Sequence, residues 1–295
     1  MISVISGIAT MRDNKESNQR VIDNFRCFQE CFFNQSLEDK ELVLIEQRRD
    51  GQTESPFDGI IDERARHAIV YGYPFGSGWL LNVGAQMADG EILDFIDADV
   101  CFDETYLADV ADAMEQQEHP YLHGYNLSYW LNEAGRKRYI DEGVGDVVSV
   151  ATGEYEDLLD RVILPDVIGN IGLSVICRRD YYFDVVGGHN ESFIAGGGRD
   201  NDFTFRVVRE AGGFPILQRP LVHLYHGGKI MGGNSALWGF TQKHPDLVTL
   251  EIKQLGVGHL SGPRRHTLEE WEKLATQYEA YKQVKDEVSA SLNNA

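Results

Sequence analysis

The chain has 295 residues, of which 42% are hydrophobic, and its formal net charge is −20 at pH 7. A chain of this length can bury one large core. A surface this acidic repels phosphate backbones and anionic membranes, so nonspecific binding to nucleic acid is disfavoured. No apolar stretch reaches the roughly 18 residues of a membrane span, and the start shows no basic-then-apolar leader, so we expect a cytoplasmic protein.

The first 117 residues alternate between strand and helix patterns. In chain order we expect a strand at 2–9, a helix around 21–32, a strand at 41–46, a helix around 79–88, a strand at 92–96 and a helix at 103–117. This alternation is typical of an open, mostly parallel sheet flanked by helices. Cys27 and Cys31 lie at helical spacing in a phenylalanine-rich segment, which favours core thiols over a zinc site or a disulfide.

The second half is less regular. Residues 131–168 are charged and punctuated by glycine, and they predict an insertion that is mobile or faces the acceptor. Beyond this insertion we expect a strand at 171–177, a helix at 200–212, a strand at 214–226, a glycine-rich loop from 227 and an amphipathic helix at 267–288. We expect the terminal helix to pack on the body of the protein or on a second subunit, as in a homo-oligomer.

The most informative segment is EILDFIDADV at 91–100, where an apolar run stops at Asp97 and Asp99. A buried strand over 92–96 places both carboxylates at its carboxyl end, the edge where ligands bind in such sheets. Two carboxylates there can share Mg²⁺ or Mn²⁺ with the phosphate oxygens of a ligand. An acidic turn without a metal is the alternative.

Four blocks of sequence, taken in order, resemble the GT-A glycosyltransferases, and among these the β-1,4-galactosyltransferase and chondroitin polymerase branch. The blocks are VLIEQ at 43–47, FGSGWLLNVGAQMADGEILDFIDADV at 75–100, GGHNESFIAGGGRDNDFTFRVVREAGG at 187–213 and LVHLYH at 221–226. The resemblance implies a Rossmann-like GT-A domain over 1–262, with a nucleotide-binding half at 1–117 and an acceptor-binding half at 118–262. A C-terminal helix at 263–295 would follow.

The resemblance also assigns roles around the metal. It implies that Asp99 and His226 bind the ion and that Asp97 contacts the metal, the ribose or the sugar. His223 is the alternative histidine, because residues 223 and 226 point to opposite faces of a straight strand. Neutral imidazole suits Mn²⁺ more than Mg²⁺. For the UDP-sugar we expect contacts from Arg12, Gln47 and Lys229.

Asp200 occupies the position of the catalytic base in this branch, and Asp202 is the fallback. The branch has a Glu-Asp pair here, whereas this chain has Arg199 before Asp200, an arginine that could hold a phosphate or a carboxylate of the acceptor. Either aspartate could instead be a favourable charge at a helix start.

We therefore expect a metal-dependent transfer of sugar from a UDP-sugar to the hydroxyl of a glycan or another acceptor, with inversion. The alternatives are a retaining transferase, a nucleotidyltransferase, a noncatalytic module that binds sugar nucleotides or glycans, and a transferase that acts on modified nucleic-acid bases. The net charge weighs against the last of these.

Overall fold

The computed structural model describes residues 1–9, 15–72, 74–142, 144–165, 172–194, 197–226 and 234–293. The strands are β1 (Ile2–Ala9), β2 (Lys40–Arg48), β3 (Arg66–Tyr71), β4 (Ile92–Ile96), β5 (Val100–Cys101), β6 (Tyr121–His123), β7 (Leu127–Leu131), β8 (Leu159–Ile163), β9 (Ser174–Arg178) and β10 (Pro220–His223). The helices are α1 (Lys15–Phe33), α2 (Ser77–Met87), α3 (Tyr106–Gln116), α4 (Glu133–Glu142), α5 (Val147–Ala151), α6 (Arg199–Ala211), α7 (Ser235–Lys243), α8 (Pro245–Leu255) and α9 (Leu268–Asn293), with a 3₁₀ turn at Glu156–Leu158 and a π-helix at Tyr181–Val186.

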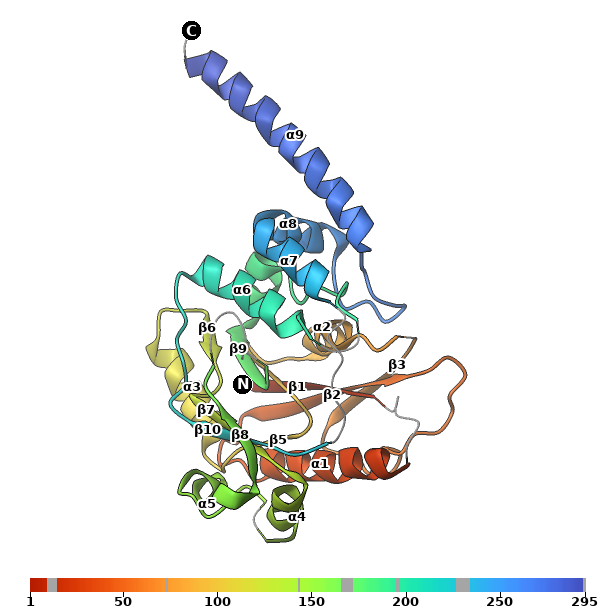
Figure 1. The fold of residues 1–295 in the computed structure, drawn as a ribbon, viewed down its shortest axis with the longest axis vertical. Coiled ribbons are helices and arrows are strands. Elements are labelled where there is room, and N and C mark those ends of the chain that lie inside the picture. Colours follow the sequence, from red (N-terminus) through yellow and green to blue (C-terminus); the bar gives the residue numbers. More distant parts are fainter. Residues whose placement is uncertain are drawn as a thin grey trace.

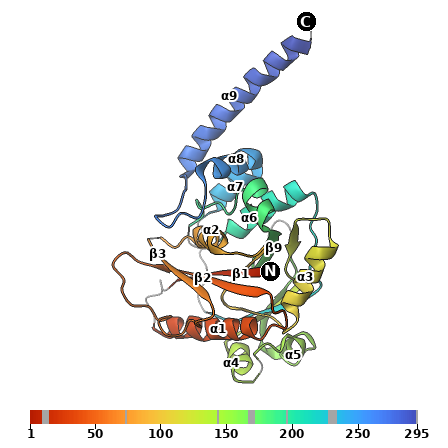
Figure 2. The same cartoon turned by 180° about the vertical axis from the view of Figure 1, so that it is seen from behind.

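A six-stranded sheet in the order β3-β2-β1-β4-β9-β6 forms the centre of the molecule. Strand β1 runs parallel to β2 and β4, and β2 runs parallel to β3, while β9 is antiparallel to both of its neighbours. Helix α1 covers one face, and α2 and α6 cover the other (Figures 1 and 2). The expected mostly parallel sheet flanked by helices is confirmed.

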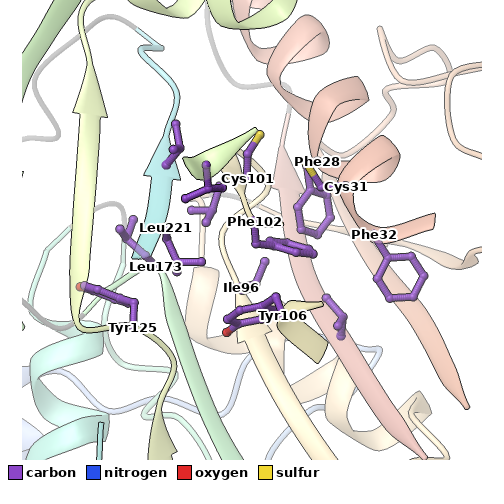
Figure 3. Close-up of a cluster of buried hydrophobic side chains, with 14 of the residues drawn as sticks. Phe28, Cys31, Phe32, Ile96, Cys101, Phe102, Tyr106, Tyr125, Leu173 and Leu221 are labelled. Carbon is purple, nitrogen blue, oxygen red and sulfur yellow. The ribbon is translucent and has the colours of Figure 1, made fainter. Parts of the chain in front are cut away.

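Helix α1 buries one apolar face against this sheet. Phe25, Phe28 and Phe32 recur at helical spacing and are at most 2% exposed. Cys27 and Cys31 lie in the same cluster as free, buried thiols, which confirms that they are core residues. Figure 3 shows Phe28, Cys31 and Phe32 of α1 beside Phe102, which directly follows β5.

Helix α2 lies unusually close to β1. At Gly84 an added Cβ would stand 2.4 Å from Cγ2 of Ile5, so only a hydrogen fits there. Two residues earlier, the amide of Asn82 donates to the His189 carbonyl and to Glu191 Oε1, both at 2.9 Å. The segment Leu-Leu-Asn-Val-Gly at 80–84 therefore contacts β1 through Gly84 and the segment before α6 through Asn82.

A second sheet, which the sequence did not predict, has four strands in the order β5-β10-β7-β8. The chain leaves β4, turns, and enters this sheet as β5, which pairs with β10. The strand expected at 214–226 is shorter than predicted. The strand ends at His223, and just beyond it the Leu224 amide donates to the Asp99 carbonyl at 2.9 Å. This hydrogen bond ties the chain after β10 to the loop that carries Asp99.

The C-terminal helices form a separate apolar cluster. Phe193, Phe240 and Trp271 join α7, α8 and the first turns of α9. Helix α9 then extends away from the body in both views (Figures 1 and 2). In the described part of the chain, no helix combines the length and the apolar character that crossing a bilayer demands.

Candidate functional site

The loop after β4 carries the two aspartates of the Asp-x-Asp motif. The Asp97 amide donates to the Leu173 carbonyl at 3.0 Å, and the Val100 amide closes a turn on the Asp97 carbonyl at 3.1 Å. Leu173 has φ of +79°, and among the described residues it is the single non-glycine with positive φ. Such a conformation is costly for a branched side chain, and it turns the Leu173 carbonyl toward the motif.

Asp99, His223 and His226 converge on one point. The Asp99 carboxylate lies 3.6 Å from His223 Nε2 through one oxygen and 3.7 Å from His226 Nε2 through the other. One ligand atom from each residue lies within 4.8 Å of the other two. Both histidines face Asp99, because the strand ends at His223 and the alternation of a straight strand no longer applies at His226.

This donor set fits a divalent transition metal. Two imidazoles and one carboxylate are ligands typical of such ions, and Mg²⁺ prefers oxygen donors. Burial lowers the pKa of His223 to about 4, so its ring is neutral near pH 7, the form that binds metals. Asp99 keeps 24% of its side chain exposed, so the cluster opens to solvent on one side, where a ligand has access.

A second charged group lies beside the first. Arg199 Nη2 contacts Asp97 Oδ1 at 3.8 Å and donates a hydrogen bond to Asp200 Oδ1. Partial burial, together with the carboxylates of Asp200 and Asp99, raises the pKa of Asp97 above its usual range, and Arg199 opposes this rise. Arg199 thus links the metal loop to the start of α6.

Two expected site residues have structural partners. Asp202 is fully buried and accepts hydrogen bonds from Arg206 at 2.8 and 3.0 Å and from Thr241 at 2.7 Å. It joins α6 to α7, and we do not retain it as a base. The buried Gln47 amide bonds to the backbone of residues 72, 74 and 76 at 3.0 to 3.1 Å, so it shapes the loop before α2. We therefore propose a structural role for Gln47 and no direct contact with the nucleotide.

The two cations expected to contact the donor, Arg12 and Lys229, lie outside the described residues. The sequence analysis also missed a residue beside the metal ligands. Trp130 of β7 stacks on His223, with ring centroids 3.8 Å apart. An aromatic residue in a short strand gives no local sign of this contact, because it depends on pairing between strands distant in sequence.

Comparison with solved structures identifies the fold as GT-A. The crystal structure of S. aureus TarS 1-349 in complex with UDP-GlcNAc matches with a TM-score of 0.55 and 14% identity, over 85% of this chain and 71% of that one. Another TarS 1-349 structure matches with a TM-score of 0.51 and 14% identity, over 76% of this chain and 60% of that one. In a longer S. aureus TarS chain the match has a TM-score of 0.51 and 14% identity and covers 89% of this chain and 44% of that one.

The present chain therefore spans less than two thirds of some of these relatives. At such low identity the likeness establishes the fold alone. No protein-family model matches the sequence, and no curated protein matches it significantly.

Proposed function

We propose that the chain is a metal-dependent glycosyltransferase that moves a sugar from a UDP-sugar to an acceptor hydroxyl, with inversion at the sugar. The observation that carries the proposal is the cluster of Asp99, His223 and His226 at the carboxyl end of β4, within a GT-A fold. In open α/β sheets this edge binds ligands. The TarS structure that holds UDP-GlcNAc supports a UDP-sugar as the donor.

The three residues of the cluster would hold Mn²⁺ rather than Mg²⁺, because two of the donors are imidazole nitrogens. A bound cation supplies positive charge where negative charge develops on the departing diphosphate. For Asp97 the proposed role is a contact with the sugar or ribose of the donor, and its position two residues before Asp99, facing Arg199, supports that role. Its carboxylate can orient those hydroxyls by accepting hydrogen bonds.

Asp200 is the group that we propose as the general base. Its carboxylate lies at the first turn of α6 and contacts Arg199, which also reaches the metal loop. To accept the proton of an acceptor hydroxyl, Asp200 must offer an oxygen within hydrogen-bond reach of that hydroxyl. Arg199 occupies one oxygen, which leaves the other for the acceptor.

The contact between Arg199 and Asp200 also favours a second candidate function. Arg199 engages a carboxylate oxygen of Asp200 that a general base would need, so the chain could bind a sugar nucleotide without turning it over. Donor hydrolysis or transfer by the wild-type protein would exclude this noncatalytic role.

The decisive experiment is calorimetric titration with UDP in Mn²⁺ and in chelator, followed by turnover assays with a panel of UDP-sugars. We expect UDP binding to require Mn²⁺ and to weaken at least about tenfold in Asp99→Ala, because the mutation removes a metal ligand. Asp200→Asn should still bind UDP and should lose about 10²- to 10⁴-fold in turnover.

Asp112→Ala is the matched control, since Asp112 is an exposed aspartate of α3. It should behave as the wild type in every assay. UDP binding that is indifferent to the metal, or that survives intact in Asp99→Ala, would remove the basis of the proposal.

A further inference from the structure

The small sheet places three side chains in a row that ends at the candidate metal site. Arg161 of β8 pairs with Trp130 of β7, and Trp130 pairs with His223 of β10. His223 in turn pairs with Val100 of β5, the residue after Asp99. Directly paired residues project from the same face of a sheet, so strand register alone aligns the row with the metal loop.

The row is packed ring on ring. The Trp130 indole and the His223 imidazole are stacked, with centroids 3.8 Å apart and planes 23° apart. Arg161 comes from β8, the neighbour of β7 on the side away from β10, and its guanidinium carbon lies 4.3 Å from the centroid of the indole, which is cation–π geometry. A hydrogen bond also restrains the orientation of the indole, because Trp130 Nε1 donates to Ser128 Oγ at 2.8 Å.

The second ring nitrogen of His223 explains why this stack matters. Histidines that bind metals usually donate their other ring N–H to a carboxylate, a carbonyl or water, which fixes the orientation of the ring. In His223, Nδ1 is buried and has no hydrogen-bond partner among the described residues. No other described residue supplies the usual constraint, and the stacked indole is a contact that can take its place.

We propose that Trp130 is a positioning residue of the metal centre, which holds the His223 imidazole in the plane that directs Nε2 at the ion, with Arg161 bracing the indole from behind. This inference rests on the metal site of the proposed function. A ring held in place before the ion arrives loses less rotational freedom on binding, so the stack increases metal affinity.

Two substitutions of similar size separate stacking from simple filling of space. Trp130→Phe keeps an aromatic plane against His223, whereas Trp130→Leu keeps an apolar side chain without a plane. Mn²⁺ affinity is measured by electron paramagnetic resonance of the free ion, with and without UDP. Because contacts that orient a metal ligand are worth about 10- to 100-fold in affinity, we expect Trp130→Leu to lose about that much and Trp130→Phe to stay within about threefold of wild type.

Electron spin-echo modulation reports how many imidazole nitrogens are bound to Mn²⁺, which gives a second readout. In a folded sample, a lower stability alone would not change this number. The wild type and Trp130→Phe should show two coupled imidazoles, and Trp130→Leu should show one. Trp238→Phe is the control for removing a tryptophan, because Trp238 packs on Phe205 of α6 and takes no part in the row.

The outcomes are distinct. If Trp130→Leu is folded by circular dichroism and binds Mn²⁺ as tightly as Trp130→Phe, with two coupled nitrogens, the positioning role is wrong and the metal site stands. If the wild-type protein binds no Mn²⁺, both the metal site and the positioning role are wrong. If Trp130→Leu fails to fold, Arg161→Ala decides: unchanged Mn²⁺ affinity and unchanged nitrogen coupling in that variant would overturn the proposal.

Discussion

Four aspartates near the site share one chemistry and differ in their neighbours. Asp99 faces two imidazoles, Asp97 faces Arg199, and Asp202 is held by Arg206 and Thr241. Asp94 of β4 is fully buried and accepts a hydrogen bond from Ser174 Oγ at 2.9 Å. At the scale of the residue, the partner and the degree of burial decide whether a carboxylate is suited to bind a metal, to join two elements or to hold a proton.

Asp94 gives a prediction about stability and pH. Burial raises its pKa to about 7, so the folded protein keeps a proton that the unfolded chain releases near pH 4. The free energy of unfolding should therefore fall as the pH rises from about 4 to 7, by a few kcal/mol, and level off above that range. Asp94→Asn cannot ionise, so it should be more stable than the wild type at pH 8 and flatten this dependence. Denaturant unfolding at pH 5, 6.5 and 8 measures the difference.

Asp112→Asn is again the matched control, because it removes an ionisable group from the surface. Its pH profile should follow that of the wild type. If Asp94→Asn shows the same slope between pH 5 and 8 as the wild type, then Asp94 does not retain its proton in the folded state.

At the scale of the element, helix packing sets the geometry of the site. Asn82 of α2 and Thr241 of α7 each bond to the segment around α6, which carries Arg199 and Asp200. The start of α6 is thus held from two sides. Gly84 has no side chain, which lets α2 approach β1 closely. The distance between the sheet and α6 therefore depends on this glycine.

Two glycine substitutions test this account of α2. Gly84→Ala places a methyl group against Ile5 and should destabilise the protein by about 1–3 kcal/mol through overpacking. Gly239 lies inside α7 with no atom within 4 Å of an added Cβ. Gly239→Ala should therefore stabilise the protein by about 0.5–1 kcal/mol, because alanine is the better helix former. Denaturant unfolding of both variants gives the change in the free energy of unfolding relative to the wild type. If the two changes have the same sign, the packing argument is wrong.

At the scale of the whole molecule, two sheets meet at the loop between β4 and β5. The large sheet supplies Asp97 and Asp99 after a strand that runs parallel to β1. The small sheet supplies His223 and the stacked row behind it, and His226 follows β10. The third apolar cluster lies apart from this junction, where Trp271 fixes the base of α9. The rest of α9 leaves the body (Figure 1).

Truncation of α9 gives a prediction at this scale. Removing residues 283–295 deletes the part of α9 farthest from Trp271. We therefore expect the melting temperature to change by less than about 2 °C, and the free energy of unfolding by less than about 1 kcal/mol. Trp271→Ala should cost about 3–5 kcal/mol, because this side chain is fully buried. Calorimetry with light scattering measures both variants. A large loss of stability with a lower molecular mass in the truncated chain would show instead that α9 joins two subunits.

Much of the fold was predictable because its signals are local. The apolar run over 92–96 and the helical spacing of Phe25, Phe28 and Phe32 each reflect the periodicity of a single element. The small sheet was not predicted, since β5 and β10 are only two and four residues long. Strands this short carry too little periodicity to be recognised, and their pairing depends on partners more than 100 positions away.

The sequence by itself determined the order β1, α1, β2, α2, β4 and α3, the Asp-x-Asp loop at a strand end and the departure at Arg199. Tertiary structure alone decided that both His223 and His226 face Asp99, that Asp202 and Gln47 are held by neighbouring elements, and that Trp130 lies on a metal ligand. The physical reason is that residue type and periodicity act within one element. Which side chains meet is set by strand register and by the residue at which each strand ends, such as His223 in β10, and these arise only when distant segments pack.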